Sequence, residues 1–334
     1  MQARKLFLLC AGIIFSMNGN AQDMKEYFES VKFINTNITG IGYEKGCTRR
    51  DPSDVIKVDD TWYVYYTKIY GQAPGYWGTV WYATSKDEGH TWKEQGKIVG
   101  VGEKNMFDSQ ATFTPNILFA NRKYYLYYTG VKPTPGNQKG EFENNSTTDI
   151  TAIGVAVSTS PNGPFVRISS GPILKVSVEP EKFDSYRVDD AALLCRNGLY
   201  WLYYKGRGRV NGEGGPVHTQ MGVAFSKNPE GPFTKLDNPI LSGSHEVMIW
   251  QEGTGIAALA SLSNTFEYAP DGIEFNSNKL GVKVENRPLA PGAYRQDLTN
   301  PKIKGEGLKW GISMVHNGDE CYLIRYELVP KLNK

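Results

Sequence analysis

The sequence predicts an all-β protein, a five-bladed β-propeller with a short N-terminal helical segment. Runs of aromatic and β-branched residues, which have the composition of strands, recur along the 334-residue chain. A second unit of strand and tight turn follows each run, and little of the remaining sequence has a helical pattern. Repeats of several strands, with a period longer than a simple hairpin, favour a propeller over a sandwich.

The two recurring units place the blades. Copies of the first unit are Trp62 to Tyr66, Tyr124 to Tyr128 and Tyr200 to Tyr204. The second unit reads as a strand, a tight Pro/Asp/Gly turn and an aromatic residue that starts the next strand. Its copies are Val80 to Trp92, Ile153 to Phe165, Met221 to Phe233 and a shorter Phe266 to Phe275.

These units predict blades near residues 50–100, 110–170, 185–240 and 245–285. We expect the tail, Lys309 to Leu328, to close a fifth ring position together with the N-terminal side. Closure by a shared blade would protect sheet edges that otherwise invite aggregation. Ser85 to Trp92 also fits S-x-D-x-G-x-T-W, the Asp-box of sialidase-like propellers. That box is a turn device remote from the catalytic face, so it supports the architecture and does not indicate a substrate.

The first 21 residues have the pattern of a secretory signal peptide. Arg4 and Lys5 precede a short apolar stretch, and small residues end the segment at Ala21. The apolar stretch is too short to cross a bilayer. We therefore expect cleavage after Ala21 and a periplasmic or secreted product. We expect residues 22–36 to form an N-terminal segment with one helix candidate, Met24 to Val31, and residues 37–334 to form one catalytic or binding domain.

Charge and cysteine content exclude several classes of protein. The formal net charge is +2, and removal of the signal peptide leaves 35 basic and 35 acidic side chains, so nothing favours nucleic-acid binding. Three cysteines remain, Cys47, Cys195 and Cys321, without a CxxC pair. An odd number of isolated cysteines predicts buried thiols rather than a disulfide scaffold or a metal site.

Acidic residues and one histidine recur where the inner strands of the predicted blades begin. Asp51, the pair Asp189 and Asp190, and the pair His245 and Glu246 occupy equivalent places in three blades. The proline after Asp51 forces an extended or turn conformation, which fits a strand entrance. Because a propeller presents these entrances to one face, we expect the side chains to converge.

This set suits glycoside hydrolysis. One group protonates the departing oxygen, a carboxylate activates water on the opposite face of the sugar, and a further carboxylate tunes the acid. An imidazole can serve as the acid if a nearby carboxylate raises its pKa. Five further residues are candidates for substrate binding: Arg49, Arg50, Thr114, Lys205 and Arg207.

Structural roles are the alternative at each position. Asp51 could cap a turn, the Asp189 and Asp190 pair could be a turn with one exposed acid, and His245 could be a histidine buried under a blade. The arginine pair Arg49 and Arg50 could form salt-bridged scaffold or hold a hydroxyl-rich or anionic sugar. We expect no direct role for the remaining histidines, of which His90 lies in an exposed turn and His218 and His316 stand alone.

Several longer motifs together resemble glycoside hydrolase family 117. The most specific is the T-R-R-D-P-S string at residues 48–53. The resemblance covers about Gly40 to Glu327. The motifs that carry it are Gly46 to Tyr66, Phe107 to Asn116, Asp149 to Gly154, Arg187 to Ala191, Tyr203 to Arg207, Tyr268 to Gly272 and Tyr294 to Asp297.

The resemblance implies a five-bladed propeller that acts as an exo-glycosidase with inversion. The implied reaction is release of 3,6-anhydro-L-galactose from the non-reducing end of neoagaro-oligosaccharides, by cleavage of an α-1,3 linkage. It implies Asp51 as general base, His245 as general acid and Glu246 as its neighbour in the site. It also implies a third acid, between Asp51 and His245 in the sequence, which is Asp189 or Asp190. Alignment of the blades favours Asp190, and counting back from Tyr204 favours Asp189.

The resemblance also bears on partners and cofactors. Family members form a domain-swapped dimer through a longer N-terminal helical segment than Gln22 to Thr36, so the sequence leaves a homodimer open. No cofactor is required. Family members can hold a hydrated divalent cation near the substrate, and no ligand cluster in the sequence predicts one. The alternatives are an arabinanase-like or fructosidase-like propeller glycosidase with Glu246 as acid, a glycosidase of another red-algal galactan, and a non-catalytic sugar-binding propeller.

Overall fold

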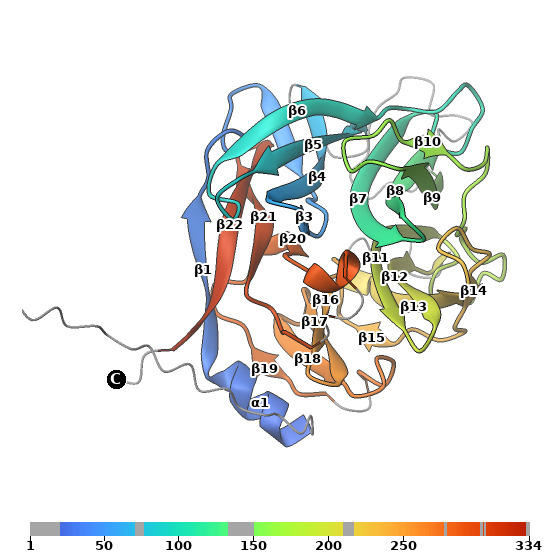
Figure 1. Cartoon of the computed structure of the whole chain (residues 1–334). Helices are drawn as coiled ribbons and strands as arrows, with labels where there is room; N and C mark the ends of the chain where they lie inside the picture. The colour runs from blue at the N-terminus through green and yellow to red at the C-terminus, as the bar shows by residue number, and fades with distance from the viewer. Residues whose placement is uncertain are drawn as a thin grey trace, which may run out of the picture.

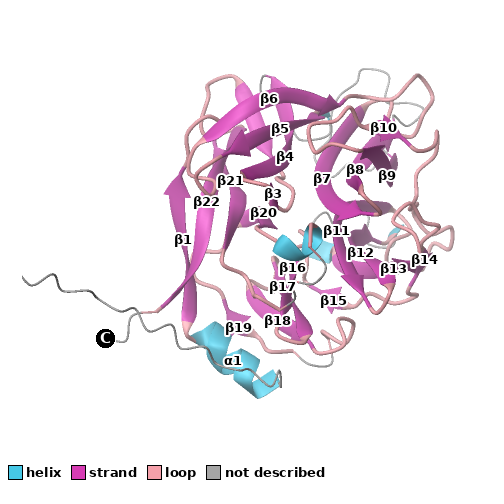
Figure 2. Cartoon of the chain, in the orientation of Figure 1, coloured by secondary structure: helices cyan, strands magenta, loops and turns pink. Residues whose placement is uncertain are grey.

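The computed structural model describes residues 21–70, 77–132, 150–209, 217–276, 279–300, 303 and 305–331. Within these ranges the strands form five antiparallel sheets that stand around a common axis as blades (Figure 1). Almost all regular structure is strand, and the one α-helix in these ranges is short and N-terminal (Figure 2). The predicted fold class, an all-β five-bladed propeller, is confirmed.

Blades 1 and 2 each run from the axis outward in sequence order. In blade 1 the order is β2 (Cys47–Arg50), β4 (Thr61–Tyr70), β5 (Thr79–Ser85) and β6 (Trp92–Val99), with β3 (Ile56–Val58) also paired to β4. In blade 2 it is β7 (Ala111–Ala120), β8 (Lys123–Lys132), β9 (Ile150–Ser158) and β10 (Val166–Arg167).

Blades 3 and 4 follow the same plan. Blade 3 consists of β11 (Arg187–Arg196), β12 (Leu199–Arg207), β13 (Gln220–Ser226) and β14 (Thr234–Lys235), with β15 (Leu241–Ser242) also paired to β13. Blade 4 consists of β16 (Ile249–Glu252), β17 (Gly255–Ala260), β18 (Thr265–Ala269) and β19 (Val282–Lys283).

Blade 5 joins the two ends of the chain. Its inner strands are β20 (Leu289–Ala293), β21 (Trp310–Asn317) and β22 (Glu320–Pro330), and its outer strand is β1 (Val31–Asn37), antiparallel to β22. The expected closure by the tail and the N-terminal side is therefore present. Residues 31–36, which the sequence placed in a segment before the propeller, belong to this blade.

The N-terminal helix packs against the propeller of its own chain. Helix α1 spans Ala21–Glu29, whereas the sequence predicted Met24 to Val31; Val31 instead begins β1. Met24 and Phe28 are fully buried, and the Phe28 ring stacks on Phe266 of β18 at 4.5 Å. No helix among the described residues has both the length and the apolar character needed to span a membrane.

The linkers that lead into blades 2 and 3 each contain a buried aspartate with matching partners, which the repeats did not reveal. Asp108 Oδ2 accepts hydrogen bonds from the Tyr128 hydroxyl at 2.9 Å and from Arg167 Nε at 2.7 Å. Since buried charges need such partners, each linker is fixed against its blade. The second linker repeats this pattern with a lysine in place of the arginine. Asp184 Oδ2 accepts hydrogen bonds from the Tyr204 hydroxyl at 2.9 Å and from Lys235 Nζ at 2.6 Å.

The Asp-box turn has the expected structural role. Asp87 Oδ1 accepts from the Ser85 hydroxyl and from the Thr91 amide, both at 2.8 Å, and Trp92 Nε1 donates to the Gly89 carbonyl at 2.8 Å. His90 is exposed in this turn. The box fixes the β5–β6 connection, and none of its residues lines the pocket described next.

Candidate active site

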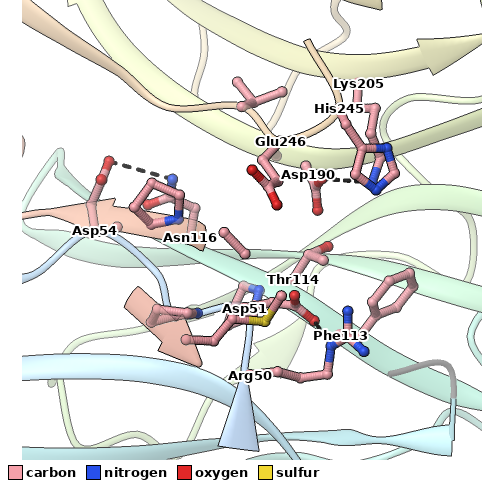
Figure 3. Close-up of a pocket in the computed structure, with 18 of the residues that line it drawn as sticks. Arg50, Asp51, Asp54, Phe113, Thr114, Asn116, Asp190, Lys205, His245 and Glu246 are labelled. Carbon is pink, nitrogen blue, oxygen red and sulfur yellow. Dashed lines mark hydrogen bonds and ion pairs between the residues drawn. The ribbon is translucent and has the colours of Figure 1, made fainter. Parts of the chain in front are cut away.

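A cavity of about 290 Å³ lies where the blades converge on the propeller axis, and Figure 3 shows residues that line it. Its volume is at the lower end of the range for small-molecule sites, which suits a terminal sugar better than a long chain segment. All five blades or the segments that lead into them contribute. The lining residues are Arg50, Asp51, Pro52, Asp54, Phe113, Thr114, Pro115, Asn116, Asp190, Ala191, Lys205, His245, Glu246, Val247, Ala290, Pro291, Gly292, Met314 and His316.

Four blades use one backbone device to aim side chains at the cavity. Asp51, Thr114, Asp190 and Ala290 have φ between 40° and 53°, a region that non-glycine residues rarely adopt. Three of them sit in β-bulges, where the register of the inner strand shifts against its neighbour. A bulge redirects a side chain and often marks a functional site. Backbone strain at these positions therefore presents two carboxylates to the axis.

Blade 4 reaches the cavity differently. His245 and Glu246 lie in the segment before β16, and the Ser261 hydroxyl accepts hydrogen bonds from both of their amides, at 2.9 and 3.0 Å. The Ser244 hydroxyl in turn donates to the Glu246 carbonyl at 2.9 Å. These contacts fix the segment across the axis from Asp51 of blade 1, because blades 3 and 4 oppose blade 1 in a five-membered ring.

Asp51 is a partly buried carboxylate that forms an ion pair with its neighbour in the sequence. Arg50 Nε donates to Asp51 Oδ2 at 2.9 Å, and the two side chains are 20% and 11% exposed. The pair lines the cavity (Figure 3). Asp51 is thus accessible to a small ligand while its carboxylate is held in one orientation.

The two adjacent aspartates of blade 3 occupy different environments. Asp190 lines the cavity and keeps 15% of its side chain exposed, whereas Asp189 is fully buried behind it. Lys205 Nζ lies between them, at 2.7 Å from Asp190 Oδ2 and 3.2 Å from Asp189 Oδ1, and Arg187 Nε donates to Asp189 at 2.9 Å. Asp190 is therefore the member of the pair that faces a ligand.

Burial disfavours the charged form of both aspartates, but their charged neighbours give the two carboxyls different pKa values. Burial raises the pKa of Asp190 to about 7; Lys205 opposes this rise, and the Asp189 and Asp51 charges add to it. Although burial also acts on Asp189, the Lys205 and Arg187 cations lower the pKa of that carboxyl below its ordinary value. Asp190 can therefore carry a proton near neutral pH while Asp189 stays ionised.

The surroundings of His245 lower its pKa, whereas a general acid was expected to have a raised pKa. Burial, with the Lys205 cation, lowers the pKa of His245 to about 2; Asp189 opposes the shift, and Arg187 and Arg207 add to it. The sequence suggests a carboxylate that raises this pKa, but burial and the basic residues of β11 and β12 outweigh it. His245 is thus a neutral imidazole in the free protein, with Nδ1 3.2 Å from the Thr219 hydroxyl.

Glu246 lines the cavity beside His245. Arg287 Nη1 donates to Glu246 Oε2 at 2.9 Å, and these side chains are 16% and 21% exposed. Asp54 also lines the cavity. It is buried and accepts hydrogen bonds from the Ala293 amide at 2.8 Å and from Arg295 Nη1 at 3.1 Å. Burial raises the pKa of Asp54, although Arg295 opposes the shift.

The structure gathers most of the predicted site residues and separates a few. Asp51, Asp190, His245, Glu246, Arg50, Thr114 and Lys205 line the cavity; Asp189, Arg49 and Arg207 do not. Arg49 is 3% exposed and pairs with Glu94 at 2.8 Å, which is the scaffold alternative stated for it. Arg207 is fully buried, with its guanidinium 5.1 Å from the Tyr186 ring centre.

Sequence reasoning missed part of the lining. His316, for which no direct role was expected, reaches the cavity from the end of β21, and its Nδ1 lies 3.3 Å from Cys321 Sγ. Asn116 and Asp54 also line it. Asp51, Thr114 and Ala290 each precede a proline, and this shared x-Pro pattern was the available signal for three of the four positions with positive φ.

The described residues hold no group of three or more His, Cys, Asp or Glu that could bind a metal ion. None of the cysteines in the described part of the chain forms a disulfide; Cys47 and Cys321 are buried, as predicted, whereas Cys195 is only partly buried. The ionisable groups that line the cavity are carboxylates, imidazoles, one amino group and one guanidinium group. Carboxylates on facing walls of one small pocket are the arrangement that glycoside hydrolysis uses.

Comparison with known proteins agrees with this class. No protein-family model matches the sequence, and no curated protein matches it. Among solved structures, Zg3597, a family 117 glycoside hydrolase produced by the marine bacterium Zobellia galactanivorans, is 26% identical. The similarity covers 90% of this chain and 91% of that chain, with a TM-score of 0.76. The resemblance to glycoside hydrolase family 117 is thereby confirmed, and it supports a glycosidase function.

Two other structures are similar at lower identity. Fructan 1-exohydrolase IIa from Cichorium intybus is 10% identical over 87% of this chain and 57% of that chain, with a TM-score of 0.55. A thermostable family-43 glycoside hydrolase is 15% identical over 88% of this chain and 92% of that chain, with a TM-score of 0.54. These two similarities show the shared fold.

Proposed function

We propose that this protein is an inverting exo-glycoside hydrolase that releases 3,6-anhydro-L-galactose from the non-reducing end of neoagaro-oligosaccharides by cleaving an α-1,3 linkage. The observation that carries the reaction class is the position of Asp51 across the axial cavity from Asp190 and His245 (Figure 3). The small volume of the cavity supports exo cleavage. The choice of sugar rests on the family 117 motifs described above.

In this proposal Asp51 removes a proton from a water molecule that attacks the anomeric carbon. The bond from that carbon to the linking oxygen breaks, and the oxygen takes a proton from the opposite wall, which Asp190 and His245 form. The surroundings favour a proton on Asp190 near neutral pH and disfavour one on His245 in the free protein. Arg50, Thr114 and Lys205 are placed to orient sugar hydroxyls.

The direct test is product analysis with neoagarobiose. Asp51→Asn should lower kcat by about 10²- to 10⁴-fold, the usual contribution of a general base. Proton NMR of the product formed first should show the inverted anomer in the wild type. Asp60→Asn, at an exposed ion pair remote from the cavity, is the matched control and should retain activity. Wild-type rates in Asp51→Asn would refute the assignment.

A second candidate is a propeller glycosidase of another specificity in which Glu246 is the acid. It is favoured by the low pKa of His245 and by the position of Glu246 in the cavity lining. Loss of activity in Glu246→Gln, with activity retained in His245→Ala, would support it. The reverse pattern would support His245. A screen of arabinan, fructan and carrageenan oligosaccharides identifies the substrate in either case.

The proposal extends to location and assembly. We propose export with cleavage after Ala21, which N-terminal sequencing of the mature protein tests. Cleavage there would leave most of α1, including the buried Met24 and Phe28, on the mature chain. A homodimer and a divalent cation near the substrate remain proposals from the family resemblance. Light scattering and a chelator titration of activity test them.

A further inference from the structure

A second hollow, of about 400 Å³, lies between blades 1 and 5. Tyr43 and Tyr322 form its aromatic part, with ring centres 5.8 Å apart and planes at 75°. Tyr43 is 54% exposed, which is unusual for a tyrosine in a chain whose other aromatic residues are mostly buried. The lining residues are Asn37, Ile38, Gly42, Tyr43, Asn317, Tyr322 and Leu323.

The hollow adjoins the axial cavity through the β21–β22 hairpin. His316, near the end of β21, lines the axial cavity, and the next residue, Asn317, lines the hollow. On β22, Cys321 pairs with His316, and the next residue, Tyr322, again lines the hollow. Since neighbouring Cα atoms are about 3.8 Å apart, one hairpin separates the two spaces. In Figure 1, β21, β22 and β1 stand side by side in blade 5.

The rim that carries Tyr43 is held in place by buried and charged groups. Arg49 donates to the Gly42 carbonyl at 3.4 Å and to Glu44 at 2.5 Å, and these residues flank Tyr43. The Gly46 amide donates to Glu320 Oε1 at 2.7 Å, which ties the same loop to the hairpin. Arg49 thus positions an aromatic ring beside the site instead of contacting a ligand in the axial cavity.

The chemistry of the hollow fits a neutral sugar ring. A pyranose offers an apolar face that packs on an exposed tyrosine ring, and hydroxyls that the amides of Asn37 and Asn317 can bind. No charged side chain is among the described lining residues, and Glu44, 56% exposed, stands beside the hollow. Since like charges repel, a sulfated sugar is disfavoured there.

We propose that the Tyr43 hollow is a distal subsite that binds an uncharged sugar ring of an oligosaccharide longer than a disaccharide, on the leaving-group side of the cleaved bond. The inference rests on the proposed function, because exo cleavage places the terminal ring in the axial cavity and sends the remaining chain outward past His316. Tyr43 then sets the preference for chain length without taking part in the reaction.

The experiment compares neoagarobiose with neoagarohexaose in wild type, Tyr43→Ala and Tyr43→Phe. Tyr43→Ala should raise KM for the hexasaccharide about tenfold, the effect of losing one aromatic contact, and leave kcat and the disaccharide KM unchanged. Tyr43→Phe keeps the ring and should behave as wild type. An equal change for both sugars, or no change for either, would overturn the subsite.

Calorimetry in the Asp51→Asn background separates this inference from the proposed reaction, because it needs no turnover. The hexasaccharide should bind more tightly than the disaccharide, and Tyr43→Ala should remove that difference. If the wild type releases no sugar, the proposed reaction fails while the calorimetry still decides the subsite. Equal affinity for both sugars, or a sulfated carrageenan hexasaccharide that gains as much from Tyr43, would contradict it.

Discussion

Replacement of Lys205 by methionine should move the alkaline limb of the pH profile upward if Asp190 carries the catalytic proton. Lys205 Nζ lies 2.7 Å from Asp190 Oδ2, and its positive charge favours the ionised carboxylate. An opposite charge at such distances changes a pKa by about 1–3 units. The pKa of Asp190 is raised to about 7, so kcat/KM of the wild type should decline above this pH as the proton is lost.

In Lys205→Met the decline should begin about 1–3 units higher. At pH 9, where a group of pKa 7 is about 1% protonated, the variant should therefore lose a much smaller part of its optimum activity than the wild type. The pKa read from the alkaline limb belongs to the pair Asp189 and Asp190 together, because two coupled carboxyls titrate with macroscopic pKa values. The assay is the initial rate on neoagarobiose between pH 4 and 10, with subsaturating substrate.

Lys86→Met is the matched control, since Lys86 forms an exposed ion pair with Asp60 at 2.7 Å, away from the cavity. It should leave the limb unchanged. An alkaline limb that stays in place in Lys205→Met would refute the assignment of the proton to Asp190. Activity that rises steadily toward low pH in the wild type would instead indicate His245, whose pKa of about 2 requires acid for protonation.

Three further predictions concern stability, each measured by urea unfolding. Burial raises the pKa of Glu252 to about 7, so the folded protein loses stability as pH rises from 4.5 through 7. Glu252→Gln carries no charge, so its free energy of unfolding should match that of the wild type at pH 4 and exceed it by about 3 kcal/mol at pH 8. The lowered pKa of His245 means that stability is lost as pH falls below 6.5, and His245→Asn should reduce that loss. Asp184→Asn leaves Tyr204 and Lys235 without their carboxylate and should cost about 2 kcal/mol, whereas Asp237→Asn, at an exposed ion pair, should change stability by under about 1 kcal/mol.

The fold could be predicted from the sequence because each blade repeats its local signals. The Tyr-rich runs became β4, β8 and β12, and the Pro/Asp/Gly turns lead into β6, β10 and β14. The limits of α1 and β1 could not be predicted, since whether Val31 ends a helix or begins a strand depends on its pairing with Pro330, 299 positions away. Local patterns carry no information about such a partner.

The candidate site was predictable where a residue type and a strand position sufficed. Asp51, Asp190, His245 and Glu246 all reach the cavity, as the equivalent places in the blades suggested. His316 was missed because it lies at the end of a second strand, whereas the repeats single out the entrances of first strands. The charge state of His245 also could not be predicted, because its pKa is lowered first by burial and then by cations of β11 and β12, which precede it by about 40 to 60 residues in the sequence.

The bulges explain why the sequence could not decide between Asp189 and Asp190. Gapless counting assigns the axial position to Asp189, because Asp189 stands as far before Tyr204 as Asp51 stands before Tyr66. The register shift between Asp189 and Ala192 inserts an extra residue, and the left-handed φ of 53° at Asp190 turns that carboxylate toward the axis. The same insertion leaves Asp189 buried against Arg187 and Lys205. One local irregularity thus separates two adjacent aspartates into a group that faces the ligand and a group that holds its neighbours in place.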